Sequence, residues 1–188
     1  MKIICVLGSP REKGNSSAIV KKFCEAAGKK GADIESFSLN SLNFKGCQGC
    51  MACKERSDRC VVNDELKPVL DSIYETDILV LASPVYMGAV TGQLKCFLDR
   101  TFSFLKPDFK TSADPSRLPG GKKALVVTTQ GAPESMFKDV PAQLEMMLKR
   151  HGFSEVKTIR GCEIRDIGDA EKNEKLMDMA VEAAKLLI

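Results

Sequence analysis

Three short, almost wholly apolar runs constrain the fold of this chain more than any other feature. They cover residues 3–7, 78–82 and 124–127. Continuous apolar character over so few residues is typical of strands that are covered on both faces, as in a parallel sheet. Residues 34–39 and 156–159 form two weaker candidates that mix in polar side chains. The pattern therefore predicts five strands, three central and two at the edges.

Helical patterns alternate with these strands, with apolar residues repeating at three- and four-residue steps. We expect Gly31 to end the first helix in a left-handed conformation and Thr91 to cap the second. The alternation predicts an α/β fold with a doubly wound, five-stranded parallel sheet of flavodoxin-like order 2-1-3-4-5. In such a sheet the loops at the carboxyl ends of the strands bind ligands. The helical patterns cover residues 16–30, 91–105, 142–150 and 170–187.

The composition is that of one ordinary globular domain over residues 1–188. Hydrophobic residues make up 44% and charged residues 28%, which excludes intrinsic disorder. The formal net charge is +3 with both signs interspersed, so the sequence offers no dedicated surface for nucleic acid or a membrane. The N-terminal apolar stretch is too short for a signal peptide, and no run approaches the length of a membrane span. We expect a cytoplasmic protein.

Two connections are longer than this fold requires. Residues 40–64 follow the second strand and contain a cysteine cluster, and residues 106–121 are rich in proline and glycine. Long connections in a compact domain usually serve in binding, as lids or in subunit contacts. We therefore expect both to be functional, with 40–64 as a cysteine-rich insertion after the second strand.

The loop after the first strand, residues 8–17, is suited to hold a phosphate. Backbone N–H groups and the positive end of a helix dipole meet there, and polar side chains add further donors. The loop matches neither G-x-x-x-x-G-K-[ST] nor G-x-G-x-x-G. A polar turn with a Ser/Asn helix cap is the alternative interpretation. The candidate phosphate ligands are Ser9, Arg11, Asn15, Ser16 and Ser17.

Several segments, in the expected order, carry a resemblance to a known family. They are Gly8-Ser9-Pro10-Arg11 with Gly14-Asn15-Ser16, then residues 83–88, 92–100 and 128–132. With them the chain resembles the flavodoxin-like NAD(P)H-dependent FMN reductase superfamily. The resemblance implies that the first loop holds the phosphate of FMN, that 83–88 and 128–132 approach the isoalloxazine ring, and that 92–100 contributes to a dimer contact. The ring-side residues that it implies are Pro84, Val85, Tyr86, Met87, Gly88 and Gly131.

Four of the eight cysteines form a compact motif, Cys47-x2-Cys50-x2-Cys53-x6-Cys60. Without a secretion signal, such a cluster predicts metal or redox chemistry rather than disulfides. Three closely spaced thiolates with a fourth soon after can wrap around one [4Fe-4S] cluster. Lys45, Lys54 and Arg56 would offset part of its negative charge. Structural zinc and redox-active free thiols are the alternatives.

The same spacing resembles the motif of iron–sulfur flavoproteins, a branch of that superfamily. The resemblance implies FMN and a [4Fe-4S] cluster as cofactors, homodimers or homotetramers, a ferredoxin-like donor, and a quinone, dioxygen or peroxide as acceptor. We therefore expect an oxidoreductase that passes electrons between the cluster and FMN, with no catalytic acid or base. A cluster-free NAD(P)H-dependent FMN or quinone reductase and a non-enzymatic redox sensor are the alternatives.

Three further expectations concern single residues outside these motifs. His151 follows a helix, where a cation would interact favourably with the dipole. Asp64 and Glu65 are expected to cap the helix that leads to the third strand. Cys5 lies in a buried strand and is expected to be an inert thiol.

Overall fold

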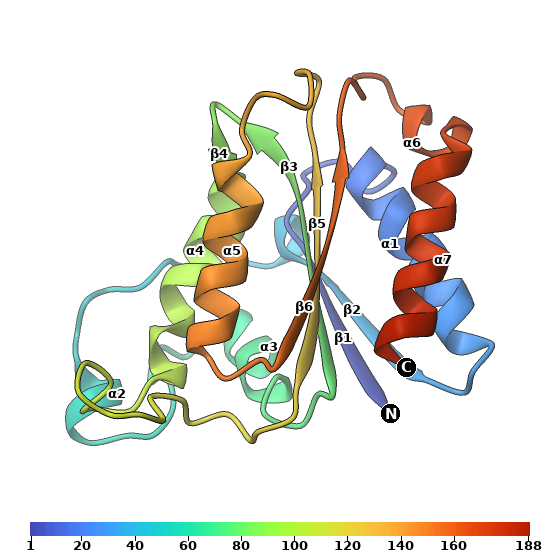
Figure 1. Cartoon of the computed structure of the whole chain (residues 1–188). Helices are drawn as coiled ribbons and strands as arrows, with labels where there is room; N and C mark the ends of the chain where they lie inside the picture. The colour runs from blue at the N-terminus through green and yellow to red at the C-terminus, as the bar shows by residue number, and fades with distance from the viewer.

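Five parallel strands form the central sheet, and every predicted strand is present. The computed structural model describes all residues, 1–188. The strand order is β2-β1-β3-β5-β6, which is the predicted order of five parallel strands once the short β4 is set aside. Their carboxyl ends lie together at the top of Figure 1. The strands are β1 (Lys2–Leu7), β2 (Asp33–Ser38), β3 (Ile78–Tyr86), β5 (Lys123–Thr129) and β6 (Glu155–Gly161).

The sequence analysis did not predict β4 (Ala89–Val90), which pairs antiparallel with the end of β3. Met87 and Gly88 connect the two strands with φ angles of 49° and 76°. Two positive φ values in succession are typical of a two-residue hairpin turn. The hairpin extends β3 beyond its apolar run, so the segment after residue 82 projects from the sheet as a rigid ribbon rather than an open loop.

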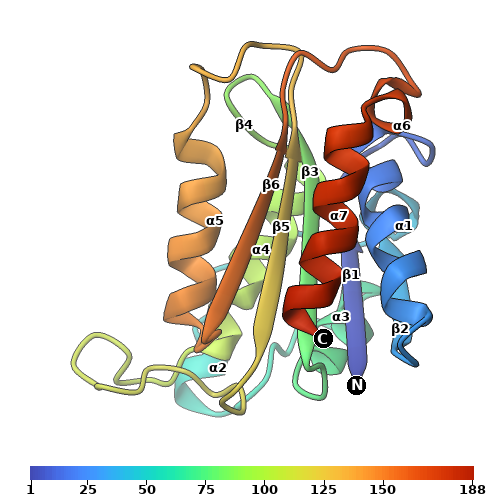
Figure 2. The same cartoon turned by 45° about the vertical axis from the view of Figure 1, so that its right-hand side comes forward.

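Two apolar cores lie on opposite faces of the sheet because successive strand residues point to opposite sides. In β1, Ile3 and Cys5 belong to a core of 19 buried residues, whereas Ile4 and Val6 belong to one of 18. Helices α1, α6 and α7 cover the first face, and α3, α4 and α5 cover the second (Figures 1 and 2). The helices are α1 (Asn15–Gly28), α3 (Leu66–Ser72), α4 (Gly92–Arg100), α5 (Asp139–Arg150), α6 (Asp169–Lys172) and α7 (Glu174–Leu187).

Two helical patterns break where the sequence predicted continuous helices. The pattern over 91–105 is α-helical only to Arg100 and continues as a 3₁₀ turn, η2 (Thr101–Phe104). The last pattern is interrupted at Asn173, whose side chain accepts a hydrogen bond from the Leu176 N–H and so caps α7. The prediction that Thr91 caps α4 is confirmed. Gly31 is left-handed as predicted, with φ of 81°, but α1 already ends at Gly28 with Lys29 as its C-cap, so Gly31 lies in the turn beyond the helix.

The two long connections lie against each other, beyond the α4–α5 layer (Figure 1). The cysteine segment runs from η1 (Leu39–Ser41) to α3 and contains one short helix, α2 (Ala52–Glu55). From the second connection, Arg117 Nη1 donates to the Cys53 carbonyl at 2.7 Å. Residues 106–121 therefore support the cysteine segment and lie far from the carboxyl ends of the strands.

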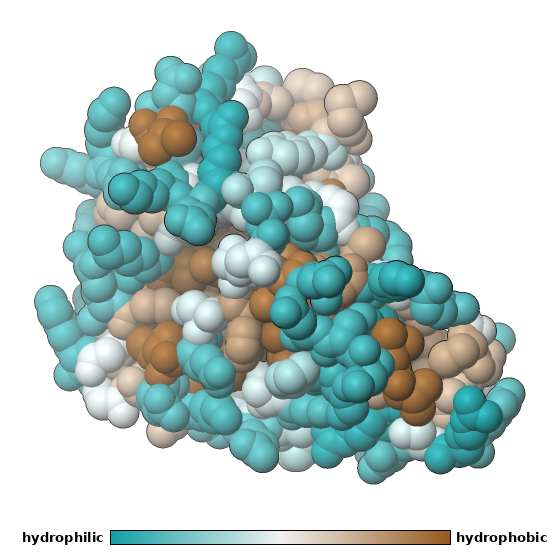
Figure 3. Space-filling view, turned by 180° about the vertical axis from the view of Figure 1, so that it is seen from behind, coloured by the Kyte–Doolittle hydropathy of each residue, from teal (hydrophilic) through white to brown (hydrophobic).

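Polar side chains cover most of the face seen in Figure 3, with apolar residues in separate patches between them. None of the helices combines the length and the apolar character needed to cross a membrane.

Candidate functional sites

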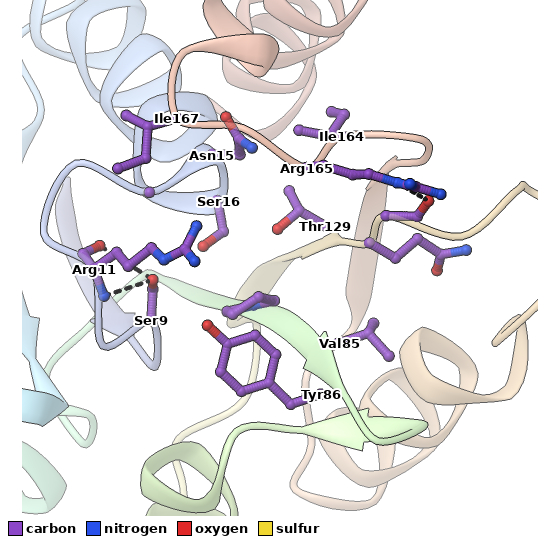
Figure 4. A pocket seen from close by; sticks show the side chains of 14 residues that line it. Ser9, Arg11, Asn15, Ser16, Val85, Tyr86, Thr129, Ile164, Arg165 and Ile167 are labelled. Carbon is purple, nitrogen blue, oxygen red and sulfur yellow. Dashed lines mark hydrogen bonds between the residues drawn. The ribbon is translucent and has the colours of Figure 1, made fainter.

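A cavity of about 360 Å³ opens at the carboxyl ends of β1, β3 and β5 (Figure 4). Its size is within the range of roughly 300–1,000 Å³ that is usual for cofactor and small-molecule sites. The position agrees with the prediction that the loops at these strand ends carry function. The lining residues are Ser9, Arg11, Gly14, Asn15, Ser16, Pro84, Val85, Tyr86, Thr129, Gln130, Gly131, Ile164, Arg165 and Ile167.

The loop after β1 is folded tightly around one serine. Ser9 Oγ accepts from the Arg11 N–H at 3.1 Å and donates to the Arg11 carbonyl at 3.1 Å. A Cβ at position 14 would lie 2.9 Å from Ser9 Oγ, so the close turn requires Gly14. Gly14 is also the N-cap of α1, and no side chain caps that helix. The first N–H groups of α1 are therefore left for a ligand, and the alternative of a Ser/Asn helix cap is wrong.

Asn15 has a different role from the free donor that the sequence suggested. Its amide nitrogen donates to the Asp166 carbonyl at 2.9 Å, and its oxygen accepts from the Ala170 N–H at 3.1 Å. Asn15 thus joins the phosphate loop to the loop after β6. Ser16 is buried and points toward the cavity in Figure 4, whereas Ser17 lies outside the lining.

The sequence analysis missed the loop after β6, which contributes Ile164, Arg165 and Ile167 to the cavity. The Asp169 carboxylate accepts from the N–H groups of Asp166, at 2.8 Å, and Arg165, at 3.0 Å. These two hydrogen bonds hold the pKa of Asp169 below its usual value. Two features of the sequence could have identified this loop. It lies at the carboxyl end of a predicted strand, and it is followed by Asp169, a residue type that often organises turns.

Two arginines line the cavity, and no carboxylate does. Arg11 and Arg165 lie on opposite sides of it (Figure 4). Arg165 Nε donates to the Gly131 carbonyl at 3.2 Å, and a Cβ on residue 131 would lie 3.0 Å from Arg165 Cγ. Gly131 therefore allows the close approach of Arg165. The electrostatics of the cavity favour an anionic ligand.

The β3–β4 ribbon forms one side of the cavity through Pro84, Val85 and Tyr86. Met87 and Gly88 form the turn beyond this side and are not in the lining; the Met87 side chain is fully exposed. On the β5 side, Gln130 is buried and its amide donates to the carbonyls of three residues in the following loop: Ala132, Pro133 and Met136. Both sides of the cavity are therefore held by the fold before a ligand binds.

The cysteine segment forms a second cavity, and all four motif cysteines line it. Left-handed backbone at Gly49 and Met51, with φ of 63° and 55°, bends the segment around this space. The four are free thiols, and no three His, Cys, Asp or Glu side chains are arranged as a metal site. Burial raises the pKa of the Cys53 thiol, and the neighbouring cysteines raise it further against the opposing effect of Lys54. Four cysteines along one cavity are the residue type that a thiolate-bound cluster requires.

None of the three expected cations, Lys45, Lys54 and Arg56, is in the lining of this cavity, whereas Arg100 is. Lys54 Nζ is held by the carbonyls of Phe102 and Leu105, both at 2.6 Å, and lies 4.0 Å from the centre of the Phe102 ring. Arg100 lines the cavity and donates from Nε to Cys60 Sγ at 3.0 Å. The sequence analysis took the helix that contains Arg100 only for core packing and a dimer contact.

Arg100 also pairs with Asp64, whose carboxylate accepts from both terminal nitrogens of the guanidinium at 2.8 and 3.2 Å. Burial opposes ionisation of Asp64, but Arg100 and two backbone N–H groups outweigh it and hold the pKa below its usual value. The capping prediction is confirmed for Asp64, which accepts from the Leu66 N–H at 3.2 Å. It is wrong for Glu65, because no Glu65 side-chain bond caps the helix; that carboxylate accepts from the Asn43 N–H.

Two other single-residue predictions have different outcomes. His151 does follow α5, but burial lowers its pKa to about 4, so it is neutral near pH 7 and the expected cation is absent. Cys5 is fully buried, with its sulfur 3.6 Å from Cys24 Sγ. The contact with Cys24 and burial both raise the pKa of the Cys5 thiol, as expected of an inert residue.

The two cavities share no lining residue and lie at opposite ends of α4. At the start of α4, Thr91 Oγ1 donates to the Gly8 carbonyl at 2.7 Å, in the loop that follows β1. At its end, Arg100 contacts the cysteine segment. Nine helical residues at 1.5 Å per residue separate these contacts by about 14 Å along the helix.

A family model described as NADPH-dependent FMN reductase matches residues 1–158. The chain belongs to this family. The membership confirms the superfamily that the motifs indicated and supports an FMN-dependent oxidoreductase.

Curated relatives of this FMN reductase family member include two archaeal proteins. An iron–sulfur flavoprotein from Methanocaldococcus jannaschii is 38% identical over 101 residues, which cover 54% of this chain and 52% of the relative. An iron–sulfur flavoprotein from Methanosarcina thermophila is 30% identical over 109 residues, covering 58% and 56%. The chain thus spans about half the length of the curated relatives it matches.

Solved structures share the fold at low identity. An NAD(P)H:quinone oxidoreductase from Methanothermobacter marburgensis superimposes with a TM-score of 0.79 at 18% identity, covering 100% of this chain and 96% of that one. An FMN-dependent NADH-azoreductase from Bacillus anthracis, in complex with FMN, gives 0.75 at 16% identity and covers 99% and 98%. These likenesses support the flavodoxin-like α/β fold.

Proposed function

We propose that this protein is an FMN-dependent oxidoreductase that passes electrons between FMN and a [4Fe-4S] cluster held by Cys47, Cys50, Cys53 and Cys60. The observation that carries the proposal is the pair of cavities at the two ends of α4, one at the strand ends and the other lined by all four motif cysteines. FMN exchanges one or two electrons and a [4Fe-4S] cluster one, so together they can connect one- and two-electron reactions.

In this proposal the first cavity holds FMN with its phosphate at the start of α1. Uncapped N–H groups, the Ser16 hydroxyl and Arg11 supply donors and positive charge there. The flavin ring occupies the space between the β3–β4 ribbon and the loop that contains Gly131. Arg165 adds a second positive charge beside that loop. Ser17, Met87 and Gly88 adjoin this site in sequence and remain predicted contacts.

The second cavity holds the cluster in this proposal, with the four cysteine sulfurs as its ligands. Val61 and Phe102 give the lining an apolar part, and Arg100 and Lys54 offset negative charge. The names of the two archaeal relatives support a cluster in this branch of the family.

A ferredoxin-like donor and a small acceptor, such as a quinone, dioxygen or peroxide, complete the proposed reaction. The ring-side residues Tyr86 and Met87 are exposed, so a small acceptor can reach the proposed flavin from solvent on that side. We also propose a cytoplasmic homodimer or homotetramer. The contacts at the two ends of α4 are about 14 Å apart along the helix, and we propose that subunit contacts bring a cluster closer to a flavin than this arrangement within one subunit does.

Iron, acid-labile sulfide and flavin per chain, measured on protein purified without oxygen, test the proposal. We expect about four iron and four sulfide with one FMN. Cys50→Ser should lose the cluster and keep FMN, while Cys162→Ser, which changes a cysteine outside the motif, should keep both. Flavin without iron would instead favour the cluster-free NAD(P)H-dependent FMN or quinone reductase, which the family match allows. Full cluster content in Cys50→Ser would refute the ligand assignment.

A further inference from the structure

Arg100, the last residue of α4, carries a charge that the fold has buried completely. Its side chain is 0% exposed. Arginine is almost never fully buried unless it is paired, because removing a charge from water costs several kcal/mol or more. This buried guanidinium lines the second cavity, the one formed by the cysteine segment, so each of its N–H groups needs a hydrogen-bond partner.

The structure provides a partner for each of the five N–H groups of Arg100. Two go to the Asp64 carboxylate, one to the Lys45 carbonyl at 2.9 Å and one to the Val62 carbonyl at 3.0 Å. The fifth, from Nε, goes to Cys60 Sγ at 3.0 Å. Lys45 precedes the first motif cysteine and Val62 follows the last, so one guanidinium ties together both ends of the cysteine segment.

The Nε hydrogen bond distinguishes Cys60 from the other three motif cysteines, whose sulfurs have no hydrogen-bond donor in the structure. A charged donor on a ligand sulfur draws electron density from the cluster and raises its reduction potential. Reduction adds a negative charge to a thiolate-bound cluster, so a nearby cation favours the reduced form. Asp64 pairs with the same guanidinium, and its negative charge lowers the reduction potential of the cluster.

We propose that Arg100 is a positioning residue that raises the reduction potential of the cluster through Cys60, and that Asp64 limits the effect. This inference rests on the proposed function. The Arg100–Asp64 ion pair therefore helps to set the driving force for electron transfer between the cluster and FMN. It also joins the two ends of the cysteine segment.

Two substitutions of the same ion pair separate this role from a structural one. Arg100→Gln removes the positive charge and the Nε donor, and Asp64→Asn removes the negative charge while leaving Arg100 beside Cys60. Either change weakens the loop, but their electrostatic effects on the cluster have opposite signs. Arg100→Lys keeps the charge with fewer donors, and Arg117→Gln removes a cation that contacts only carbonyl groups, at Cys53 and Ser103.

The measurement is an anaerobic redox titration of each cluster-loaded protein, with the cluster followed by electron paramagnetic resonance and the flavin by its visible spectrum. For Arg100→Gln we expect the equilibrium constant for cluster reduction to fall about tenfold, which is about 59 mV for one electron. Asp64→Asn should shift the potential upward, and Arg100→Lys should lie between Arg100→Gln and the unmodified protein. The FMN potential should stay unchanged in all variants because the flavin cavity is at the other end of α4.

Several outcomes would overturn the inference. Shifts of Arg100→Gln and Asp64→Asn in the same direction, or the absence of a shift, would leave Arg100 with a structural role only. If Arg100→Gln does not hold iron, the other two variants test the inference. The cluster potential should then rise in Asp64→Asn and fall in Arg100→Lys, and any other result would overturn it. Unmodified protein without iron and sulfide would refute the proposed function, and this inference with it, before any variant is compared.

Discussion

Thr91→Val should destabilise the protein and loosen FMN binding, although Thr91 does not line the flavin cavity. The side chain is buried, donates to the Gly8 carbonyl at 2.7 Å and accepts from the Leu94 N–H at 3.3 Å. Valine has nearly the same shape and can make neither bond. The change therefore removes a helix cap and a hydrogen bond to the loop after β1 at once.

The magnitude follows from these two bonds. Losing a threonine N-cap costs about 1 kcal/mol. Leaving a buried carbonyl without its donor costs about 1–3 kcal/mol. The free energy of unfolding should therefore fall by about 2–4 kcal/mol, and the affinity for FMN should fall as well because Gly8 begins the loop that holds the phosphate.

Urea unfolding of the flavin-free protein measures the first effect, and fluorescence titration with FMN measures the second. Thr111→Val is the matched control: Thr111 is exposed, and its hydroxyl donates only to the nearby Asp108 carbonyl. We expect the control to stay within about 0.5 kcal/mol of the unmodified protein. An equally small change in Thr91→Val, with an unchanged slope against urea, would refute the role assigned to this residue.

Three further predictions concern other parts of the structure. Arg165→Gln should weaken FMN binding by about tenfold or more in a fluorescence titration, because it removes one of two cavity cations, and should leave iron content unchanged. Gly8→Ala should lower the free energy of unfolding by about 1–3 kcal/mol in urea, since the new Cβ would lie 2.7 Å from Leu94 Cβ. His151 has a folded-state pKa of about 4, below its unfolded value of 6.5, so its contribution is present above pH 6.5 and is lost as the pH falls toward 4. Unfolding at a series of pH values should show a loss of about 3 kcal/mol over this window, which His151→Phe should abolish.

The parts of the fold that the sequence predicted are those in which a local pattern determines the outcome. The three apolar runs are typical of strands covered on both faces, and the threonine at 91 caps the helix that follows it directly in the chain. The β3–β4 hairpin was missed because its turn is formed by Met87 and Gly88, and methionine is not a usual residue at a positive φ.

The missed site residues share a different property, since their roles depend on contacts far along the chain. Arg100 has the position of an ordinary cation at the end of a helix, and only the packing of 40–64 against α4 reveals that it contacts Cys60. Arg165 follows a predicted edge strand, and Asn15, 151 residues before Asp166, brings its loop to the cavity. Tertiary hydrogen bonds of this kind leave no periodic trace in a sequence.

Helix α4 relates the two proposed cofactors because a different polar side chain anchors each of its ends. Thr91 joins its start to the loop after β1, and Arg100 joins its end to the cysteine segment. The anchors are independent, so Thr91→Val should change flavin affinity at constant iron content, and Arg100→Gln should change the cluster at constant flavin affinity. A rigid helix between separately adjustable sites keeps their separation constant while each potential is tuned. Under the proposed function, the rate of electron transfer within a subunit is then governed by the two potentials, and a faster route must come from contacts between subunits.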